Sequence, residues 1–390
     1  MDTLLSSFIL EHENDDLKKL ALQANLYPDI DLSLAIRQIK GRQVAREKIP
    51  AWYANQHIEY PLHLSLEQSS SEATAKFKAS LFQGKSMLDL TGGMGVDFYF
   101  IGQNFDSATY IESQSELVGL AEKNFEVLNF PVQVCHADAT AYLESVNFAE
   151  LIYIDPARRD SGGKKTVRIE DCTPNVIEIE RLLNEKAQVV AIKLSPMLDI
   201  SLALQTLRHV SDIYIISLKN ECKELLFIKR KDWILEPIFH CINILSETDV
   251  QVFDFMKSNE NLQNCAYTAS IDKYLYEPNA SILKAGAYKS IAREFNLKKL
   301  HQNSHLYTSD VLHINFPGRK FLVKSDFSFN KNQLKENLRG VEKANITVRN
   351  YPLTAEELRK KLKLKDGGIH YIFASRVLGD RKILLLCEKK

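Results

Sequence analysis

The sequence has few cysteines, and none of them stands in a pattern typical of metal binding. The six are spread along the chain, with no Cys-x-x-Cys pair and no histidine at ligand spacing. A structural zinc site and a disulfide framework are therefore disfavoured, no metal is expected, and the thiols are expected to be reduced. These residues are Cys135, Cys172, Cys222, Cys241, Cys265 and Cys387.

Long apolar runs and a basic leader are also missing. No apolar stretch approaches the roughly 20 residues that are needed to cross a bilayer. The first residues, Met1 to Leu5, contain no basic segment followed by a hydrophobic one. Neither a membrane span nor a secretory signal is predicted, and a cytoplasmic location is expected.

The chain has no excess of charge of either sign, since 50 Lys and Arg balance 50 Asp and Glu. A hydrophobic content of 45% with 26% charged residues is ordinary for a soluble globular protein. The length of 390 residues is enough for two or three domains, each with its own core.

The most informative stretch is Met-Leu-Asp-Leu-Thr-Gly-Gly-Met-Gly-Val-Asp at residues 87–97, where an apolar strand enters a glycine-rich turn that opens a helix. Gly93 and Gly95 allow the backbone to approach a ligand, and the first free N–H groups of the helix face anionic groups. A dinucleotide fingerprint starting at Gly93 would need a small residue at position 98, but Phe98 stands there. The turn therefore predicts a nucleotide-like cofactor other than NAD.

Acidic residues follow successive apolar runs after this turn. Glu112 ends one run, Asp138 follows the next, and Asp155 with Pro156 ends a third. The alternation of strands and helices from about 84 to 232 predicts a mostly parallel sheet with helices on both faces. Because ligands bind beyond the carboxyl ends of such strands, these acids and Asp89 are expected to converge on one crevice. Two further runs, at 212–218 and 224–229, predict a closing antiparallel hairpin.

This ordered series, over residues 84–232, resembles the class I S-adenosylmethionine-dependent methyltransferases. The resemblance implies a Rossmann-like α/β sheet and S-adenosyl-L-methionine as cofactor. It assigns the methionine part to the glycine turn, the ribose hydroxyls to Glu112 and the adenine to the acid after the third strand. The cofactor-binding residues implied are Asp89, Thr91, Gly93, Gly95, Glu112, Asp138 and Ala139. Thr91 stands where many members of the family have their first glycine.

The resemblance also places the transferred methyl group beside Asp155 and Pro156, which are the implied catalytic residues. A carboxylate that accepts a hydrogen bond from an amino N–H would direct the nitrogen lone pair at the methyl carbon, and Pro156 would fix the adjoining backbone. Ala157 and Arg158 replace the second proline and the aromatic residue found in nucleic-acid amino methyltransferases. This departure leaves the target atom open. A carbon-methylating mechanism with a nucleophilic cysteine is disfavoured.

Basic residues near this motif suggest phosphate contacts. The loop after Asp155 carries five positive charges with two glycines, although an ordinary solvated loop is the competing interpretation. An arginine there could stack on a base or grip a phosphate. Lys193, at the end of the fifth strand, would face either the substrate or solvent. The substrate-binding candidates are Arg158, Arg159, Lys164, Lys165 and Lys193.

Residues 1–82 have helical apolar spacing and no strand pattern, which predicts a helical N-terminal region. Ser69 to Glu72 fits a capping box that opens a helix. Because this helix leads into the first strand, the segment from Gln68 to Thr74 is either a lid over the cofactor or a plain packing helix.

The chain after the predicted methyltransferase domain (83–232) changes character. A helix at 281–295 flanked by short strands at 305–307 and 311–316 predicts a ferredoxin-like α+β domain over 233–325. The last segment is basic: residues 327–390 hold 15 Lys and Arg against 7 Asp and Glu. With a helix at 354–364 and two strands after it, residues 326–390 resemble a THUMP-like C-terminal domain of bacterial methyltransferases, which implies RNA as partner.

The preferred hypothesis is a methyltransferase that modifies a base in tRNA or rRNA. A methyltransferase for a protein or small molecule stays open as an alternative. A catalytically inactive RNA-binding module is the other alternative, because of the altered motif at Asp155 to Arg158. The oligomeric state is not predicted.

Overall fold

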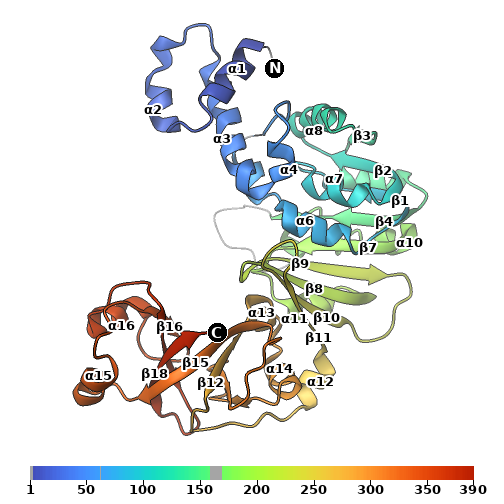
Figure 1. Cartoon of the computed structure of the whole chain (residues 1–390). Coiled ribbons are helices and arrows are strands. Elements are labelled where there is room, and N and C mark those ends of the chain that lie inside the picture. Colours follow the sequence, from blue (N-terminus) through green and yellow to red (C-terminus); the bar gives the residue numbers. More distant parts are fainter. Residues whose placement is uncertain (1–2, 62, 159–168) are drawn as a thin grey trace. The chain divides into compact units, whose positions relative to one another are not determined.

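The computed structural model describes residues 3–61, 63–158 and 169–390. The chain forms two compact units (Figure 1). Unit 1 consists of Met1–Ile213 and Glu224–Glu236, and unit 2 of Tyr214–Lys223 and Pro237–Lys390.

Unit 1 begins with the expected helices, because its apolar residues recur at helical spacing. Leu5, Phe8, Leu20 and Ile39 are buried together in a small core of this region. The helices are α1 (Thr3–Glu11), α2 (Leu17–Leu22), the 3-10 helix η1 (Ala24–Leu26), α3 (Leu32–Lys48), α4 (Pro50–Tyr53), α5 (His63–Gln68) and α6 (Glu72–Ala79).

The sheet of unit 1 has the strand order β8-β9-β7-β4-β1-β2-β3. Neighbours among the last five are parallel, whereas β9 pairs antiparallel with β7. The strands are β1 (Gly84–Asp89), β2 (Phe105–Glu112), β3 (Gln133–His136), β4 (Ala149–Ile154), β7 (Ala187–Leu194), β8 (Val210–Leu218) and β9 (Glu221–Arg230). The expected Rossmann-like α/β sheet with its closing hairpin is confirmed, and the boundary between the units runs through this hairpin.

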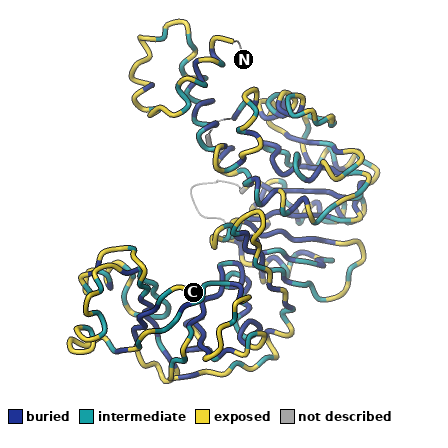
Figure 2. Tube along the Cα trace, in the orientation of Figure 1, coloured by how far each residue is buried: buried dark blue, intermediate teal, exposed yellow. Residues whose placement is uncertain are grey.

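Helices alternate with these strands, and the apolar strands between them are the most buried part of unit 1 (Figure 2). The connecting elements are α7 (Val96–Gly102), α8 (Ser115–Val127), α9 (Ala139–Ser145), α10 (Glu180–Lys186) and α11 (Ile200–Thr206), with the short elements β5 (Ala157–Arg158), η2 (Ile169–Asp171) and β6 (Cys172–Thr173). Parallel strands end at the same edge, so the turns after β1, β2, β3 and β4 gather there.

Unit 2 contains the antiparallel pair β10 and β11 and a seven-stranded sheet of order β13-β14-β12-β15-β18-β17-β16. The strands are β10 (Ile238–Ile244), β11 (Val250–Met256), β12 (Tyr274–Pro278), β13 (Lys298–Lys299), β14 (Tyr307–Ser309), β15 (Gly318–Phe327), β16 (Asn345–Val348), β17 (His370–Arg376) and β18 (Lys382–Lys389). The helices are α12 (Lys257–Leu262), α13 (Ala280–Ala285), α14 (Tyr288–Glu294), α15 (Lys331–Asn337) and α16 (Ala355–Leu362). Among the described residues, no helix combines the length and apolarity that a membrane span requires.

The structure corrects three local predictions. The helix expected at 281–295 is two helices, because Gly286 ends α13 in a left-handed conformation with φ +76°. The strand expected at 311–316 is absent from this described segment, where Val311, Leu312 and Ile314 are exposed and Phe316 alone of its apolar side chains is buried. The strand expected at 305–307 begins at Tyr307.

The capping box expected at the start of α6 is also incomplete. Ser71 is the N-cap, and its hydroxyl accepts the Thr74 N–H. The carboxylate of Glu72 instead accepts the N–H of Ala51 at 2.7 Å, so it fastens α4 to α6.

Candidate active site

The turn between β1 and α7 has the backbone conformation that its glycines predict. Gly93 and Gly95 have φ +56° and +84°, a region that favours glycine. A Cβ at Gly95 would lie 2.7 Å from the Phe125 ring, whereas one at Gly93 would meet only the Thr91 carbonyl oxygen, at 3.7 Å. The backbone at Gly93 is therefore open to close approach by a ligand, while Gly95 is packed.

Glu112, at the end of β2, supports this turn from the neighbouring strand. One carboxylate oxygen accepts the Gly93 N–H at 2.9 Å, and the other accepts the Gln114 N–H at 2.8 Å. The hydroxyl of Tyr110 donates to the Gly93 carbonyl. The structure thus brings Glu112 and Gly93 together, as the position of both at the carboxyl edge predicts.

Asp138 follows the next strand towards the edge of the sheet: β3 ends at His136, which pairs with Glu112, and Asp138 lies two residues further on. Its carboxylate caps α9 by accepting the N–H groups of Thr140 and Ala141. Asp138 is exposed, and Ala139, the first residue of α9, is buried beneath it. Both N–H groups donate to the Asp138 Oδ1, so helix capping accounts for the hydrogen bonds of this one carboxylate oxygen.

Thr91 links Asp89, at the end of β1, to Asp155, just after β4. The Thr91 N–H donates to the Asp89 Oδ1 at 2.9 Å, and the Asp155 N–H donates to the Thr91 Oγ1 at 2.6 Å. The Asp155 side chain is 40% exposed, whereas Asp89 and Pro156 are buried. The predicted catalytic acid therefore stands open beside the glycine turn, on a backbone that the turn itself holds.

Burial is the main cause that raises the pKa of Asp89 to about 8; the Asp97 and Asp155 carboxylates act in the same direction, and the Thr91 N–H and Lys193 act against it. The folded protein then keeps a proton that an unfolded chain releases near its ordinary pKa of 3.8. Between about pH 4 and 8 this group makes folding less favourable as the pH rises, by up to about 1.4 kcal/mol per pH unit.

We expect Asp89→Asn to remove this contribution, because an amide oxygen still accepts the Thr91 N–H and has no proton to lose. The variant should gain stability over wild type from pH 4 towards pH 8 and keep a constant advantage above it. Urea unfolding of both proteins across this range measures the difference, and parallel pH profiles would contradict the assignment.

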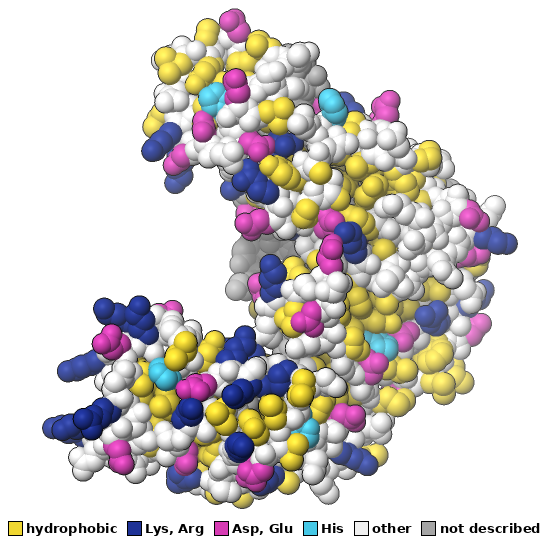
Figure 3. All heavy atoms as spheres, in the orientation of Figure 1, with side chains coloured by type: hydrophobic (Ala, Val, Ile, Leu, Met, Phe, Trp, Pro, Cys, Tyr) yellow, Lys and Arg dark blue, Asp and Glu magenta, His cyan; other side chains and the backbone are white. Residues whose placement is uncertain are grey.

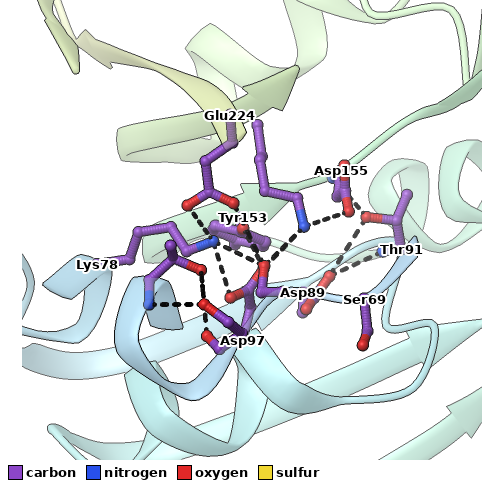
Figure 4. A network of polar contacts seen from close by, with 12 residues as sticks. Ser69, Lys78, Asp89, Thr91, Asp97, Tyr153, Asp155 and Glu224 are labelled. Carbon is purple, nitrogen blue, oxygen red and sulfur yellow. Dashed lines mark hydrogen bonds and ion pairs between the residues drawn. The ribbon is translucent and has the colours of Figure 1, made fainter. Parts of the chain in front are cut away.

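A buried network of charges lies behind Asp155 (Figure 4). The Lys193 ammonium, on β7, is 2.6 Å from the Asp155 Oδ2 and 2.9 Å from the Asp97 Oδ2, and it also donates to the Ser70 Oγ at 3.1 Å. The Tyr153 hydroxyl donates to the same Asp97 oxygen at 2.8 Å. Lys193 is thus held inside the protein and does not face solvent.

Lys78, on α6, forms the other half of the network. Its ammonium lies 2.9 Å from the Asp97 Oδ1 and 2.7 Å from the Glu224 Oε1, and donates to the Ser70 Oγ at 2.9 Å. The Lys78 side chain is 0% exposed. Figure 4 shows Lys78 and Glu224 reaching this point from separate elements, so the network joins α6, α7, β7 and β9.

These pairings hold Asp97 and Lys193 in their charged forms. Burial alone would raise the pKa of Asp97, but Lys193 and Lys78 outweigh burial and lower it. Burial would lower the pKa of Lys193, but Asp155 and Asp97 raise it well above its usual range. The network therefore consists of two cations held between three carboxylates, those of Asp97, Asp155 and Glu224.

Five residues of the network were not predicted as site residues from the sequence: Ser70, Lys78, Asp97, Tyr153 and Glu224. Two of them carry a signal in the sequence. Asp97 is a lone acid in the apolar run Val-Asp-Phe-Tyr-Phe-Ile, and Glu224 opens the apolar half of β9. A charged residue within such a run predicts a buried partner.

Arg159, Lys164 and Lys165 lie outside the described residues. Arg158 belongs to β5, which pairs with β6 through Cys172. All six cysteines are free thiols. The described residues contain no group of side chains able to hold a metal ion.

Strand order, glycine turn and the acid after β4 together define a methyltransferase of class I. Family models match the C-terminal part: a ferredoxin-like domain at residues 274–317 and a THUMP domain-like model at residues 318–389. No curated protein matches the sequence.

Solved structures give a match over the whole chain. A protein of Porphyromonas gingivalis W83, assigned as a methyltransferase, is 34% identical over 99% of this chain and 97% of its own, with a TM-score of 0.88. The chain therefore belongs to the same family, the class I methyltransferases with a THUMP-like C-terminal domain.

More distant structures resemble parts of the chain. One, described as a class I S-adenosylmethionine-dependent methyltransferase of Listeria monocytogenes, is 12% identical over 64% of this chain and 95% of its own, with a TM-score of 0.39. An rRNA methylase of Streptococcus thermophilus is 15% identical over 40% of this chain and 93% of its own, with a TM-score of 0.31.

Proposed function

We propose that this methyltransferase, whose cofactor is S-adenosyl-L-methionine, methylates a base in tRNA or rRNA. The observation that carries the proposal is the partly exposed Asp155 carboxylate, fixed by Thr91 and Lys193 beside the open backbone of Gly93. A fixed acceptor at this place suits an amino group that must present its lone pair in one direction. Such positioning can contribute on the order of 7 to 11 kcal/mol to a two-substrate reaction.

The residues at the strand ends fit the cofactor chemically. An open glycine backbone suits close packing of the methionine part, near Asp89 and Thr91, with Gly95 shaping the turn. In this proposal Glu112 takes the ribose hydroxyls, and Asp138 with Ala139 borders the adenine. The bound cofactor supplies the activated methyl group, and the protein's own task is to align the acceptor and exclude water.

Within this mechanism Asp155 accepts a hydrogen bond from the substrate N–H and turns the nitrogen lone pair towards the methyl carbon. Pro156 restricts the backbone next to it. Arg158, Arg159, Lys164 and Lys165 stay proposed contacts to the RNA. We also retain as a proposal the division into four domains at 1–82, 83–232, 233–325 and 326–390.

Charge on the THUMP-like domain supports RNA as substrate. Exposed lysines and arginines gather over α15, α16 and the turns after them (Figure 3). Clustered cations of this kind bind phosphates and make binding dependent on salt. The patch consists of Lys331, Lys335, Arg339, Lys343, Lys360, Lys361, Lys363 and Lys365.

Calorimetric titration with S-adenosylmethionine, followed by tritiated methyl transfer to bulk tRNA, rRNA and protein, tests the function directly. Label in RNA supports the proposal. Label in protein alone favours a protein methyltransferase. Cofactor binding without transfer to any of these favours a small-molecule substrate or an inactive RNA-binding module.

We expect the double variant Lys361→Glu, Lys365→Glu to raise the KM for RNA and leave kcat unchanged. If each lysine contacts one phosphate, the slope of log affinity against log salt should become less negative by about 1.4 to 1.8. Lys18→Glu, Lys19→Glu on α2 is the matched control, because both lysines are exposed in unit 1. Equal salt slopes for the two double variants would exclude the patch from RNA binding.

A further inference from the structure

The ammonium of Lys193 has no hydrogen left for a substrate. An ammonium group carries three N–H donors. Three protein oxygens lie around this one: the Asp155 Oδ2 at 2.6 Å, the Asp97 Oδ2 at 2.9 Å and the Ser70 Oγ at 3.1 Å. This arrangement differs from the role of substrate contact that the sequence suggests for Lys193.

The groups that contact Lys193 from the interior also have their hydrogen-bonding positions filled. The Ser70 hydroxyl donates to Asp97 at 2.7 Å and accepts from both Lys78 and Lys193, which uses its one hydrogen and both lone pairs. The Lys78 ammonium likewise has three oxygen neighbours. Lys193 is therefore held by groups whose own hydrogen bonds are all filled. These groups cannot move with Lys193 towards a substrate.

The Asp155 side chain differs from that of Lys193, because it is not enclosed by the protein. Its side chain is the partly exposed end of the network, and its other partner among the described residues, Thr91, holds only its backbone N–H. The orientation of the Asp155 carboxylate therefore depends on Lys193.

We propose that Lys193 is a positioning residue: it holds the ionised Asp155 carboxylate in the direction that the acceptor requires, and Asp97 and Lys78 hold Lys193. This inference rests on the proposed function, because it concerns the catalytic acid of that reaction. It assigns to a buried lysine a part in turnover that involves no contact with cofactor or RNA.

The negative charges near Asp155 explain why a cation is needed at the position of Lys193. Within the described parts of the chain, the groups that face Asp155 are Lys193 from β7, Asp97 from α7, Asp89 from β1 and Tyr153 from β4. Lys193 is the cation among these named groups. Without it, the ionised Asp155 would stand near the Asp97 carboxylate with no compensating charge, so protonation of Asp155 would become more favourable.

Lys193→Met keeps the length of the side chain and removes the charge. We expect kcat for RNA methylation to fall by about 100-fold, the loss typical of a misplaced catalytic group. The KM for RNA and the Kd for S-adenosylhomocysteine should stay within a few fold of wild type. The acid limb of the kcat profile should move to higher pH.

Lys229→Met is the matched control. Lys229 is a buried lysine of the same sheet, 1% exposed, and pairs with Glu180. Its loss should reduce stability without moving the pH profile. Should Lys193→Met fail to fold, Asp97→Asn offers a second variant that keeps the size of the side chain and should give a smaller fall in kcat. Because it removes a negative charge near Asp155, it should move the acid limb to lower pH.

A raised KM for RNA with unchanged kcat would overturn the inference in favour of substrate contact. Equal effects of Lys193→Met and Lys229→Met would overturn it in favour of a purely structural pair. If wild type itself transfers no methyl group to RNA, the proposed function fails, and a crystal structure of Lys193→Met then decides. A changed or disordered Asp155 carboxylate supports the positioning role, and an unchanged one refutes it.

Discussion

Replacing Asp155 with alanine should abolish methyl transfer while cofactor affinity stays within a few fold of wild type. The carboxylate is partly exposed beside the glycine turn, and its loss removes the proposed acceptor for the substrate N–H. A fall in kcat of about 10²- to 10⁴-fold is expected for a positioned group of this kind. Single-turnover transfer of tritiated methyl to RNA measures the rate, and calorimetry with S-adenosylhomocysteine measures the affinity.

Asp106→Ala is the control for this experiment. Asp106 is an exposed aspartate near the start of β2, at the edge of the sheet opposite the glycine turn. It should have wild-type activity. Full activity of Asp155→Ala would remove Asp155 from the mechanism.

Replacing Asp97 with alanine should have the largest effect on stability. Asp97 is buried between Lys78 and Lys193, so its removal leaves two buried cations each with one carboxylate fewer. Breaking a buried ion pair on one side typically costs about 3 to 5 kcal/mol. Both tryptophans, Trp52 and Trp233, belong to unit 1, so tryptophan fluorescence during urea unfolding reports on this unit.

Asp138→Ala provides the comparison. Asp138 is an exposed N-cap of α9, and loss of such a cap costs about 1 kcal/mol. The prediction for Asp97 fails if the two variants lose similar stability.

The sequence predicts those parts of the site that depend on local pattern. Asp89 and Gly93 lie within a few residues of one another, and Glu112 ends the next strand, so all three are predicted from alternation and turn chemistry alone. Their convergence follows from parallel pairing, because parallel strands end at one edge. Family resemblance then adds the expected cofactor.

The network behind Asp155 depends on a different kind of information. Ser70 and Lys78 precede the sheet, Asp97 follows its first strand, and Glu224 belongs to its last hairpin. Ser70 and Glu224 are 154 residues apart in sequence. Only the complete strand order brings them together. A lone charge in an apolar run predicts that a partner exists, but it does not identify the partner residue.

The predictions that are wrong in unit 2 also depend on information beyond local pattern. Leu312, Ile314 and Phe316 alternate with polar residues as a strand does, but Val311, Leu312 and Ile314 are exposed. Alternation predicts a strand only when one face is buried, and burial is a property of the whole fold.

Lys78 and Ser70 also bear on where the catalytic part of the chain begins. Both precede residue 83, the position at which sequence pattern starts the methyltransferase domain, yet they neutralise and hydrogen-bond charges deep inside its sheet. A fragment cut at the first strand would carry Asp97 and Glu224 without Lys78, the counterion that they share. The smallest self-sufficient catalytic fragment must therefore reach back through α6 to Ser70, which makes the helical segment a component of the catalytic core and not a separable appendage.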